Sequence, residues 1–233
     1  MVLGADTEAA HRRWVILDRE MLRKRGFKYE VKTFFSGINL DELLKPDAKV
    51  LELGCGYGDI LRGLKKGFDI EAHGLDLERY KSLLDYIQFW RREKIQFLRG
   101  DIENLPYREG TFDFIFSYKS FLYVPDKLEG LTQAHRVLKK GGTAIIDLEE
   151  VNGNGPNISP PIEAIIANYP NEDQVVVEKI HVNRLHHLMG HTINRVTIHK
   201  KSDAPLDFPK VLIAHTSDSP FAYTPDIFTT YQS

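Results

Sequence analysis

The sequence predicts an α/β protein with a mostly parallel sheet and helices on both of its faces. Short apolar runs that suit buried strands alternate, from residue 48 to residue 150, with amphipathic stretches of about 10–15 residues. Connections through such helices are right-handed and make neighbouring strands parallel. In addition, the first apolar run leads directly into three alternating glycines, in "VLELGCGYGDI" (50–60).

The amino-terminal part predicts two helices and the first strand-helix-strand unit. Residues 6–25 read as an amphipathic helix, and a second helical stretch carries Leu40, Leu43 and Leu44 and ends at Pro46. "KVLELG" (49–54) suits a buried parallel strand because it is short and almost continuously apolar. "ILRGLKKG" (60–67) then predicts a helix, and "DIEAHGLDL" (69–77) a second strand.

The alternation continues through the middle of the chain. A helix is predicted over 78–93, where Tyr80, Leu83, Leu84, Ile87 and Trp90 recur at helical spacing. Strands follow over 94–101 and 111–119, then a helix over 126–140 and a fifth strand over 141–150.

After residue 150 the pattern changes. Residues 151–161 hold three prolines, two glycines and three asparagines and predict a loop, followed by a short helix near 162–168 and a helical segment over 173–189. Residues 191–200 and 208–216 then predict a closing strand pair. We expect one domain over 1–233, with N-terminal helices in 6–45, a core in 48–150, an insertion in 151–190 and the strand pair in 191–216.

Composition narrows the class of protein. The chain has 233 residues, 42% hydrophobic and 27% charged, as in ordinary soluble globular proteins. A net charge of −2 gives no strong signal for nucleic acid, and no apolar run approaches the ~20 residues of a membrane span. The single cysteine, Cys55, fits a reducing, cytoplasmic setting, and the N-terminus becomes charged too early for a secretory signal.

The alternating glycines need an explanation, because glycine costs about 0.5–1 kcal/mol relative to alanine in regular structure. In open α/β sheets ligands bind beyond the carboxyl ends of the strands, and glycines there let the backbone approach the ligand. A strand-to-helix turn with incidental glycines is one alternative. A nicotinamide site is another, but it needs G-x-G-x-x-G, and the sixth position counted from Gly54 is Asp59.

Five ordered segments resemble the motifs of the class I S-adenosylmethionine-dependent methyltransferases. They are "LELGCGYG", "HGLDLE", "LRGDIENLPY", "TFDFIFSYKSFLYVPD" and "AHRVLKKGGTAIIDLEE", which lie within about residues 48–150. The resemblance implies a Rossmann-like, seven-stranded, mostly parallel sheet with an antiparallel strand near the C-terminus. It also implies S-adenosylmethionine as cofactor and S-adenosylhomocysteine as product.

The resemblance implies roles for individual residues. Asp76 would bind the ribose hydroxyls and would have few other contacts in the protein without ligand. Glu52 would face the methionine end of the cofactor. Asp101 and Ile102 would contact the adenine, although Asp101 also suits a turn cap. Cys55 is expected to fill a small site beside the cofactor. The full expected cofactor set is Glu52, Gly54, Cys55, Gly56, Gly58, Asp76, Leu77, Asp101, Ile102 and Ser117.

Methyl transfer demands little catalysis from the protein, because the sulfonium is already activated and alignment supplies most of the acceleration. A base can still deprotonate the acceptor, and the candidates are Tyr118 and Glu149, with Lys119, Asp147 and Glu150 beside them. The loop "SYKSFLYV" lacks the "[DN]PP[YFW]" motif of family members that methylate exocyclic amines. The acceptor is therefore expected to be a small molecule, bound by residues 6–45 and 151–190.

Other interpretations remain open at the level of sequence. His187 and His191 have the spacing of metal ligands on a helix, but Gly190 weakens that helix and no metal site is expected. His186 and His187 suit a partly exposed position or one that lines the acceptor pocket. The chain could also be a catalytically silent cofactor-binding partner or a nucleotide-binding oxidoreductase. The glycine motif and Asp76 argue for cofactor binding, but they do not separate a methyltransferase from a catalytically silent partner.

Overall fold

The structure is a computed structural model that describes residues 32, 34–77, 94–151, 174–181 and 192–208. Within these ranges the strands are β1 (Ala48–Leu53), β2 (Ile70–Asp76), β3 (Gln96–Arg99), β4 (Phe112–Ser117), β5 (Leu138–Val151), β6 (Gln174–His181) and β7 (Thr192–His199). The helices are α3 (Leu40–Leu43), α4 (Asp59–Gly67), the 3-10 turn η1 (Phe121–Tyr123) and α6 (Lys127–Val137). No helix in the described ranges is long and apolar enough to cross a membrane.

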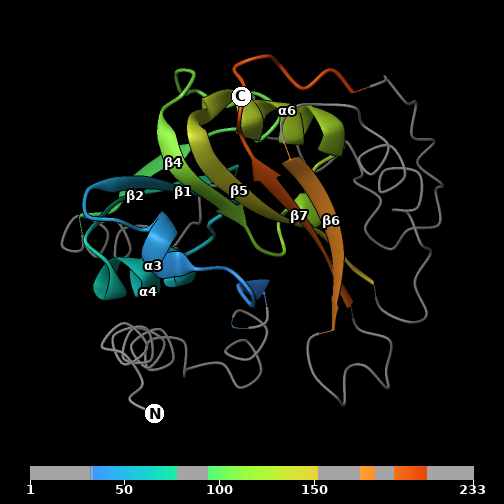
Figure 1. Cartoon of the computed structure of the whole chain (residues 1–233). Helices are drawn as coiled ribbons and strands as arrows, with labels where there is room; N and C mark the ends of the chain where they lie inside the picture. Colours follow the sequence, from blue (N-terminus) through green and yellow to red (C-terminus); the bar gives the residue numbers. More distant parts are fainter. Residues whose placement is uncertain (1–31, 33, 78–93, 152–173, 182–191, 209–233) are drawn as a thin grey trace, which may run out of the picture.

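All of these strands form one seven-stranded sheet in the order β3-β2-β1-β4-β5-β7-β6 (Figure 1). Strands β1 to β5 pair in parallel, whereas β7 runs antiparallel to both β5 and β6. The predicted fold class is therefore confirmed, including the antiparallel strand near the C-terminus. The strand order reverses between β1 and β4, which is where sheets of this kind bind ligands.

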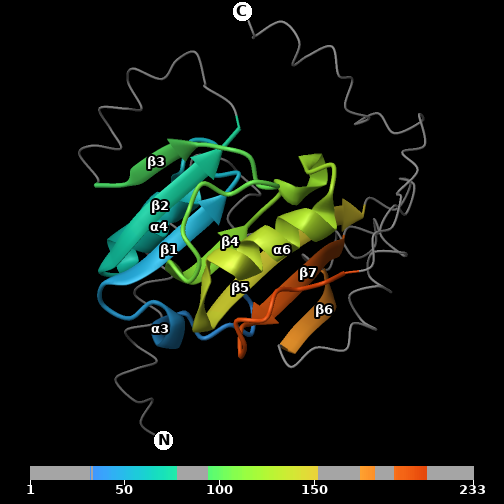
Figure 2. The same ribbon diagram turned by 90° about the horizontal axis from the view of Figure 1, so that it is seen from above.

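Helices cover the two faces of the sheet separately: α3 and α4 lie on one face and α6 on the other (Figures 1 and 2). Because side chains alternate along a strand, β1 contributes Val50 to the α4 side and Leu51 and Leu53 to the α6 side. Both faces of the central strands are thus buried, which explains why their sequences read as nearly continuous apolar runs.

The predicted helix over 173–189 is wrong for its first half, because Gln174–His181 is strand β6. Three consecutive β-branched residues, Val175, Val176 and Val177, favour a strand. In the sheet, Val175 and Val177 pack against the apolar cluster beneath α6. The segment 151–190 is accordingly not purely an insertion, since it supplies a strand of the sheet.

The predicted closing pair is half confirmed. Residues Thr192–His199 form β7, but the strand beside β7 is β6, not 208–216. Residues 209–216 lie outside the described residues, as do 182–191 and the helices expected over 6–25, 78–93 and 162–168.

The boundary between the predicted helix over 126–140 and the fifth strand also differs. Helix α6 ends at Val137, and Leu138 already has extended backbone angles and pairs with Phe112 of β4. The strand therefore begins three residues before Gly141. Helix α6 is capped at its start, where the Asp126 carboxylate accepts from the amide of Glu129 at 2.9 Å.

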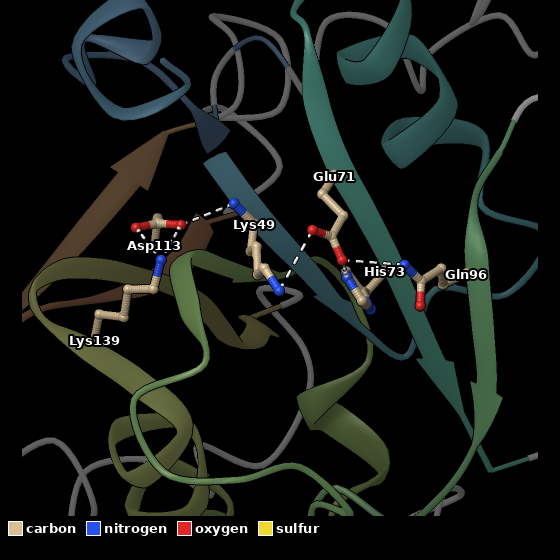
Figure 3. Close-up of polar contacts among 6 residues, drawn as sticks. All are labelled: Lys49, Glu71, His73, Gln96, Asp113 and Lys139. Atoms are coloured by element: carbon tan, nitrogen blue, oxygen red, sulfur yellow. Dashed lines mark hydrogen bonds and ion pairs between the residues drawn. The ribbon is translucent and has the colours of Figure 1, made fainter. Parts of the chain in front are cut away.

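Polar contacts join the strands at the amino edge of the sheet (Figure 3). The Asp113 carboxylate of β4 accepts from the backbone N–H of Lys49 in β1 and from Nζ of Lys139 in β5, each at 2.8 Å. One half-exposed carboxylate thus links β1, β4 and β5.

A second carboxylate, that of Glu71 in β2, links the strands on the other side of β1 (Figure 3). It contacts Nε2 of His73 at 2.9 Å, Nε2 of Gln96 at 3.1 Å and Nζ of Lys49 at 3.4 Å. Burial raises the pKa of Glu71, but His73 and Lys49 outweigh it, and the net shift is downward. Burial lowers the pKa of His73 despite its hydrogen bond to Glu71. These contacts lie at the edge of the sheet opposite the glycines, where they link neighbouring strands.

The turn between β1 and α4 explains the three glycines. Gly54, Gly56 and Gly58 all have positive φ, at +68°, +50° and +70°. The backbone N–H groups of Gly54 and Cys55 both donate to the carbonyl of Leu75 in β2, at 2.8 and 3.0 Å. A Cβ on Gly54 would lie 2.2 Å from the Cβ of Ser120, so no side chain fits there.

We predict that Gly54→Ala lowers the free energy of unfolding by about 3 kcal/mol or more, because left-handed strain and the Ser120 clash add. Gly110→Ala is the matched control, since Gly110 also has positive φ (+60°) but open space around it. That control is expected to cost about 1–2 kcal/mol. Urea unfolding of the two variants measures the difference, and equal losses would mean that contact with Ser120 is unimportant.

Candidate functional site

The glycine turn and the end of β2 meet at the carboxyl edge of the sheet. The Asp76 carboxylate, at the last residue of β2, accepts from the backbone N–H of Gly56 through Oδ2 at 2.7 Å. The expectation that this carboxylate has little else to hold without ligand is therefore wrong. Asp76 orients the glycine turn directly, and it stands at the end of the strand next to β1, where the sequence placed it.

Glu52 lies beneath the same turn and is buried. Its Oε2 accepts from the backbone N–H of Leu61 at 3.2 Å. Helix α4 starts after Gly58, which has no side chain to cap it, so the Glu52 carboxylate satisfies a first-turn donor instead. Burial raises the pKa of Glu52 well above its ordinary value, against the lowering effect of the Leu61 hydrogen bond.

Cys55 fills a gap between the turn and β2. Its side chain is buried, and a Cβ on Gly74 of β2 would lie 2.7 Å from the Cys55 sulfur. Burial raises the pKa of the Cys55 thiol, with the Glu52 and Asp76 carboxylates adding to the shift. The thiol is thus held neutral, as befits the packing role that the sequence suggested.

The residues expected at the adenine lie after β3. Asp101 is exposed, and its Oδ1 accepts from the backbone N–H of Glu103 at 2.9 Å, which makes it the turn cap that the sequence left open as an alternative. Ile102 beside it is buried in the apolar cluster beneath α6. Leu77, just after β2, is 40% exposed, and its carbonyl accepts from Nε of Arg99.

Two serines connect β4 and the loop after it to the end of β1 and the glycine turn. Ser117 is fully buried and donates its hydroxyl to the Leu53 carbonyl at 2.9 Å. Ser120, which the sequence analysis did not single out, donates to the Gly54 carbonyl at 2.8 Å. No sequence motif marks Ser120. Its small polar side chain lies opposite Gly54, and this relation appears only when the two loops are placed together in the structure.

The candidate bases lie around this loop. Tyr118 is buried, with its ring centroid 5.2 Å from that of Phe34. Lys119 has a positive φ of +57°, a strained conformation for a residue with a side chain, and its backbone N–H donates to Oδ2 of the buried Asp147 at 3.3 Å. The side chains of Glu149 and Glu150 lie outside the described parts of the structure, as do His186, His187 and His191.

Arg195 of β7 holds the segment before α3 on the same side of the sheet as Tyr118. Its buried guanidinium donates from Nη1 to the carbonyls of Phe34 at 2.6 Å and Ser36 at 2.8 Å, and from Nη2 to Glu178 of β6 at 2.7 Å. The Phe34 ring in turn packs against Tyr118. This arrangement places an amino-terminal segment next to the loop after β4.

We predict that Glu52→Gln changes stability in a pH-dependent way. Because the folded protein holds the Glu52 proton above the ordinary pKa of 4.5 and the unfolded chain releases it, wild-type stability falls as the pH rises above 4.5. Glutamine does not ionise and retains an acceptor for Leu61.

The free energy of unfolding of Glu52→Gln should therefore exceed that of wild type at pH 8, and the excess should shrink toward pH 4.5. Each unit of pKa elevation is worth about 1.4 kcal/mol at high pH. Urea unfolding at the two pH values tests this, and an excess that does not change with pH would contradict it.

The comparisons with known proteins agree with this geometry. Residues 51–146 match the family model described as a methyltransferase domain. The chain is 33% identical over 112 residues to sarcosine/dimethylglycine N-methyltransferase of Halorhodospira halochloris, which covers 46% of this chain and 39% of that protein. It is also 34% identical to the chloroplastic 2-methyl-6-phytyl-1,4-hydroquinone methyltransferase 1 of Oryza sativa subsp. japonica. That alignment spans 113 residues and covers 45% of this chain and 32% of that protein.

A solved structure shares the fold over most of the chain. The putative sarcosine dimethylglycine methyltransferase of Galdieria sulphuraria superposes with a TM-score of 0.60 and 16% identity, covering 86% of this chain and all of that one. The chain spans 39% and 32% of the two curated relatives, so the similarity in sequence concerns only part of each of them. Residues 51–146 thus match a methyltransferase domain, and the solved structure shares the fold in which the glycine turn lies.

Proposed function

We propose that the protein is a methyltransferase that uses S-adenosylmethionine to methylate a small molecule. The observation that carries the proposal is the hydrogen bond from the Gly56 backbone, in the turn after β1, to the Asp76 carboxylate at the end of the neighbouring β2. Both residues lie beside the strand-order reversal and inside the matched residues 51–146. A ribose offers two neighbouring hydroxyl donors, and one carboxylate at a strand end can accept both.

The proposed cofactor path follows the carboxyl edge. The glycine turn approaches the cofactor with bare backbone, Asp76 accepts from the ribose, and the segment Asp101–Ile102 lies at the adenine. Glu52 sits beneath the methionine end, where its buried carboxylate fixes the start of α4 through Leu61. Leu77, Cys55 and Ser117 complete the proposed cofactor set, the first through its exposed side chain and the others through packing.

Bound S-adenosylmethionine supplies an activated methyl group. The protein aligns the acceptor and excludes water, and Tyr118 or Glu149 is proposed to remove a proton where the acceptor requires it. The acceptor is proposed to be a small molecule because the two curated relatives are named for an amine and for a hydroquinone. The single cysteine supports a cytoplasmic location.

We predict that S-adenosylhomocysteine raises the melting temperature of the protein, whereas NAD and NADP leave it unchanged. A ligand that binds only the folded state stabilises that state by mass action, by about 2.7 kcal/mol at one hundred times its Kd. Thermal unfolding with each ligand decides between the cofactor classes. A shift with NADP and none with S-adenosylhomocysteine would exclude the proposed function.

We predict that Asp76→Asn weakens S-adenosylhomocysteine binding about 10- to 100-fold, because charge-assisted hydrogen bonds become neutral ones at a loss of about 1.4–2.8 kcal/mol. The amide retains an acceptor for Gly56, so the turn is preserved. Calorimetric titration measures the affinity.

Two controls accompany this variant. Asp113→Asn makes the same chemical change at the amino edge and should leave the affinity unchanged. A 2′-deoxy analogue should bind wild type more weakly but lose less than the parent ligand in Asp76→Asn, since one partner hydroxyl is already missing. An equal loss for both ligands would show that Asp76 does not hold the ribose.

A further inference from the structure

Asn194 of β7 is a buried polar residue whose side-chain amide makes no hydrogen bond among the described residues. Its side chain is 0% exposed, and neither its Oδ1 nor its Nδ2 has a hydrogen-bond partner in the structure as described. A buried amide without partners destabilises a protein relative to an apolar side chain of the same shape. The amide thus adds no hydrogen bond to the described part of the fold.

The register places Asn194 at the functional edge of the sheet. Because β7 is antiparallel, its first residues lie beside the carboxyl ends of the parallel strands. Ser117, the last residue of β4, pairs with Ile146, which pairs with Val196. Asn194 lies two residues further toward this edge and thus beyond the end of β4.

The side chains of β7 alternate between the two faces of the sheet, and this alternation determines the face on which Asn194 lies. Val196 and Ile198, which share a face with Asn194, belong to the apolar cluster beneath α6. The same cluster contains Leu148 of β5 and Phe121 and Val124 from the loop after β4. Asn194 therefore lies on the face over which that loop folds.

An irregularity in the sheet occurs opposite Asn194. The pairing of β5 with β7 shifts register between Asp147 and Glu149, so that Asp147 pairs with Arg195 and Glu149 with Asn194. Bulges of this kind redirect side chains and are common beside active sites. The bulge and the buried amide thus coincide at the carboxyl edge.

We propose that the Asn194 amide binds the polar group of the methyl acceptor. This inference rests on the proposed function and specifies its substrate: a largely apolar molecule with a neutral hydroxyl or carboxamide group. The amide offers one donor group and one acceptor, which such a group complements. A charged group would need a counter-charge, and the neighbouring buried cation, Arg195, lies on the opposite face and is held by Phe34, Ser36 and Glu178.

The first experiment measures how much the buried Asn194 amide destabilises the folded protein. Asn194→Leu should raise the melting temperature of the ligand-free protein by about 2–6 °C, because the unsatisfied amide is removed. Thr197→Val is the matched control: the Thr197 hydroxyl is also buried and without a partner among the described residues, but it lies on the other face of β7. A ligand-free Asn194→Leu no more stable than wild type would overturn the inference.

The second experiment measures binding to the proposed site with small probes. Benzamide, phenol and toluene are titrated into the full chain saturated with S-adenosylhomocysteine, and the side-chain amide of Asn194 is followed by NMR. Benzamide and phenol should shift this signal in wild type and in Thr197→Val, and toluene should not.

Binding of benzamide, followed through its own resonances, should weaken about tenfold or more in both Asn194→Leu and Asn194→Ala, the second variant guarding against a steric effect of leucine. Unchanged binding of benzamide in both variants would overturn the inference. Binding of S-adenosylhomocysteine tests the proposed function separately, and the Asn194 variants should retain it. Loss of benzamide binding with retained cofactor binding supports the role of Asn194.

Discussion

The close approach of two loops at the end of β1 is the constraint on which the rest of the carboxyl edge depends. Gly54 lies against Ser120 so tightly that a single added carbon would fall 2.2 Å from the Ser120 Cβ. Around this contact, the Leu75 carbonyl receives two backbone donors, and the Ser117 and Ser120 hydroxyls bind the carbonyls of Leu53 and Gly54. The ends of β1, β2 and β4 are thereby held in one fixed arrangement.

The polar groups at the two edges of the sheet differ in how many hydrogen-bond partners they have. At the amino edge, Asp113 and Glu71 each bind several partners in neighbouring strands. At the carboxyl edge, Lys119 is held at a positive φ, Glu52 is buried with a raised pKa, and the Asn194 amide has no hydrogen bond among the described residues. Strained conformations and unpartnered polar groups are common at functional sites of proteins, and favourable contacts elsewhere in the fold offset their cost.

The sequence was sufficient for features that depend on local pattern, and insufficient for those that depend on contacts between distant segments. The strands β1, β2 and β4 were predictable from apolar runs, and the glycines from their spacing. Strand β6 was missed although Val175–Val177 favoured it, because a helical pattern was extended across it. The hydrogen bond from Leu61 to Glu52 and the contact of Ser120 with Gly54 could not be predicted, since each depends on how separate loops meet.

Arg195 carries a consequence for synthesis of the chain on the ribosome. Its guanidinium binds the carbonyls of Phe34 and Ser36, which precede it by 161 and 159 residues. At about 5–20 residues per second, those carbonyls emerge on the order of ten seconds or more before their partner is made. The hydrogen bonds that hold this segment beside Tyr118 therefore form only after β7 has been translated. Folding of strands β1 to β5 can start earlier, because these strands follow one another in the chain before β6 and β7.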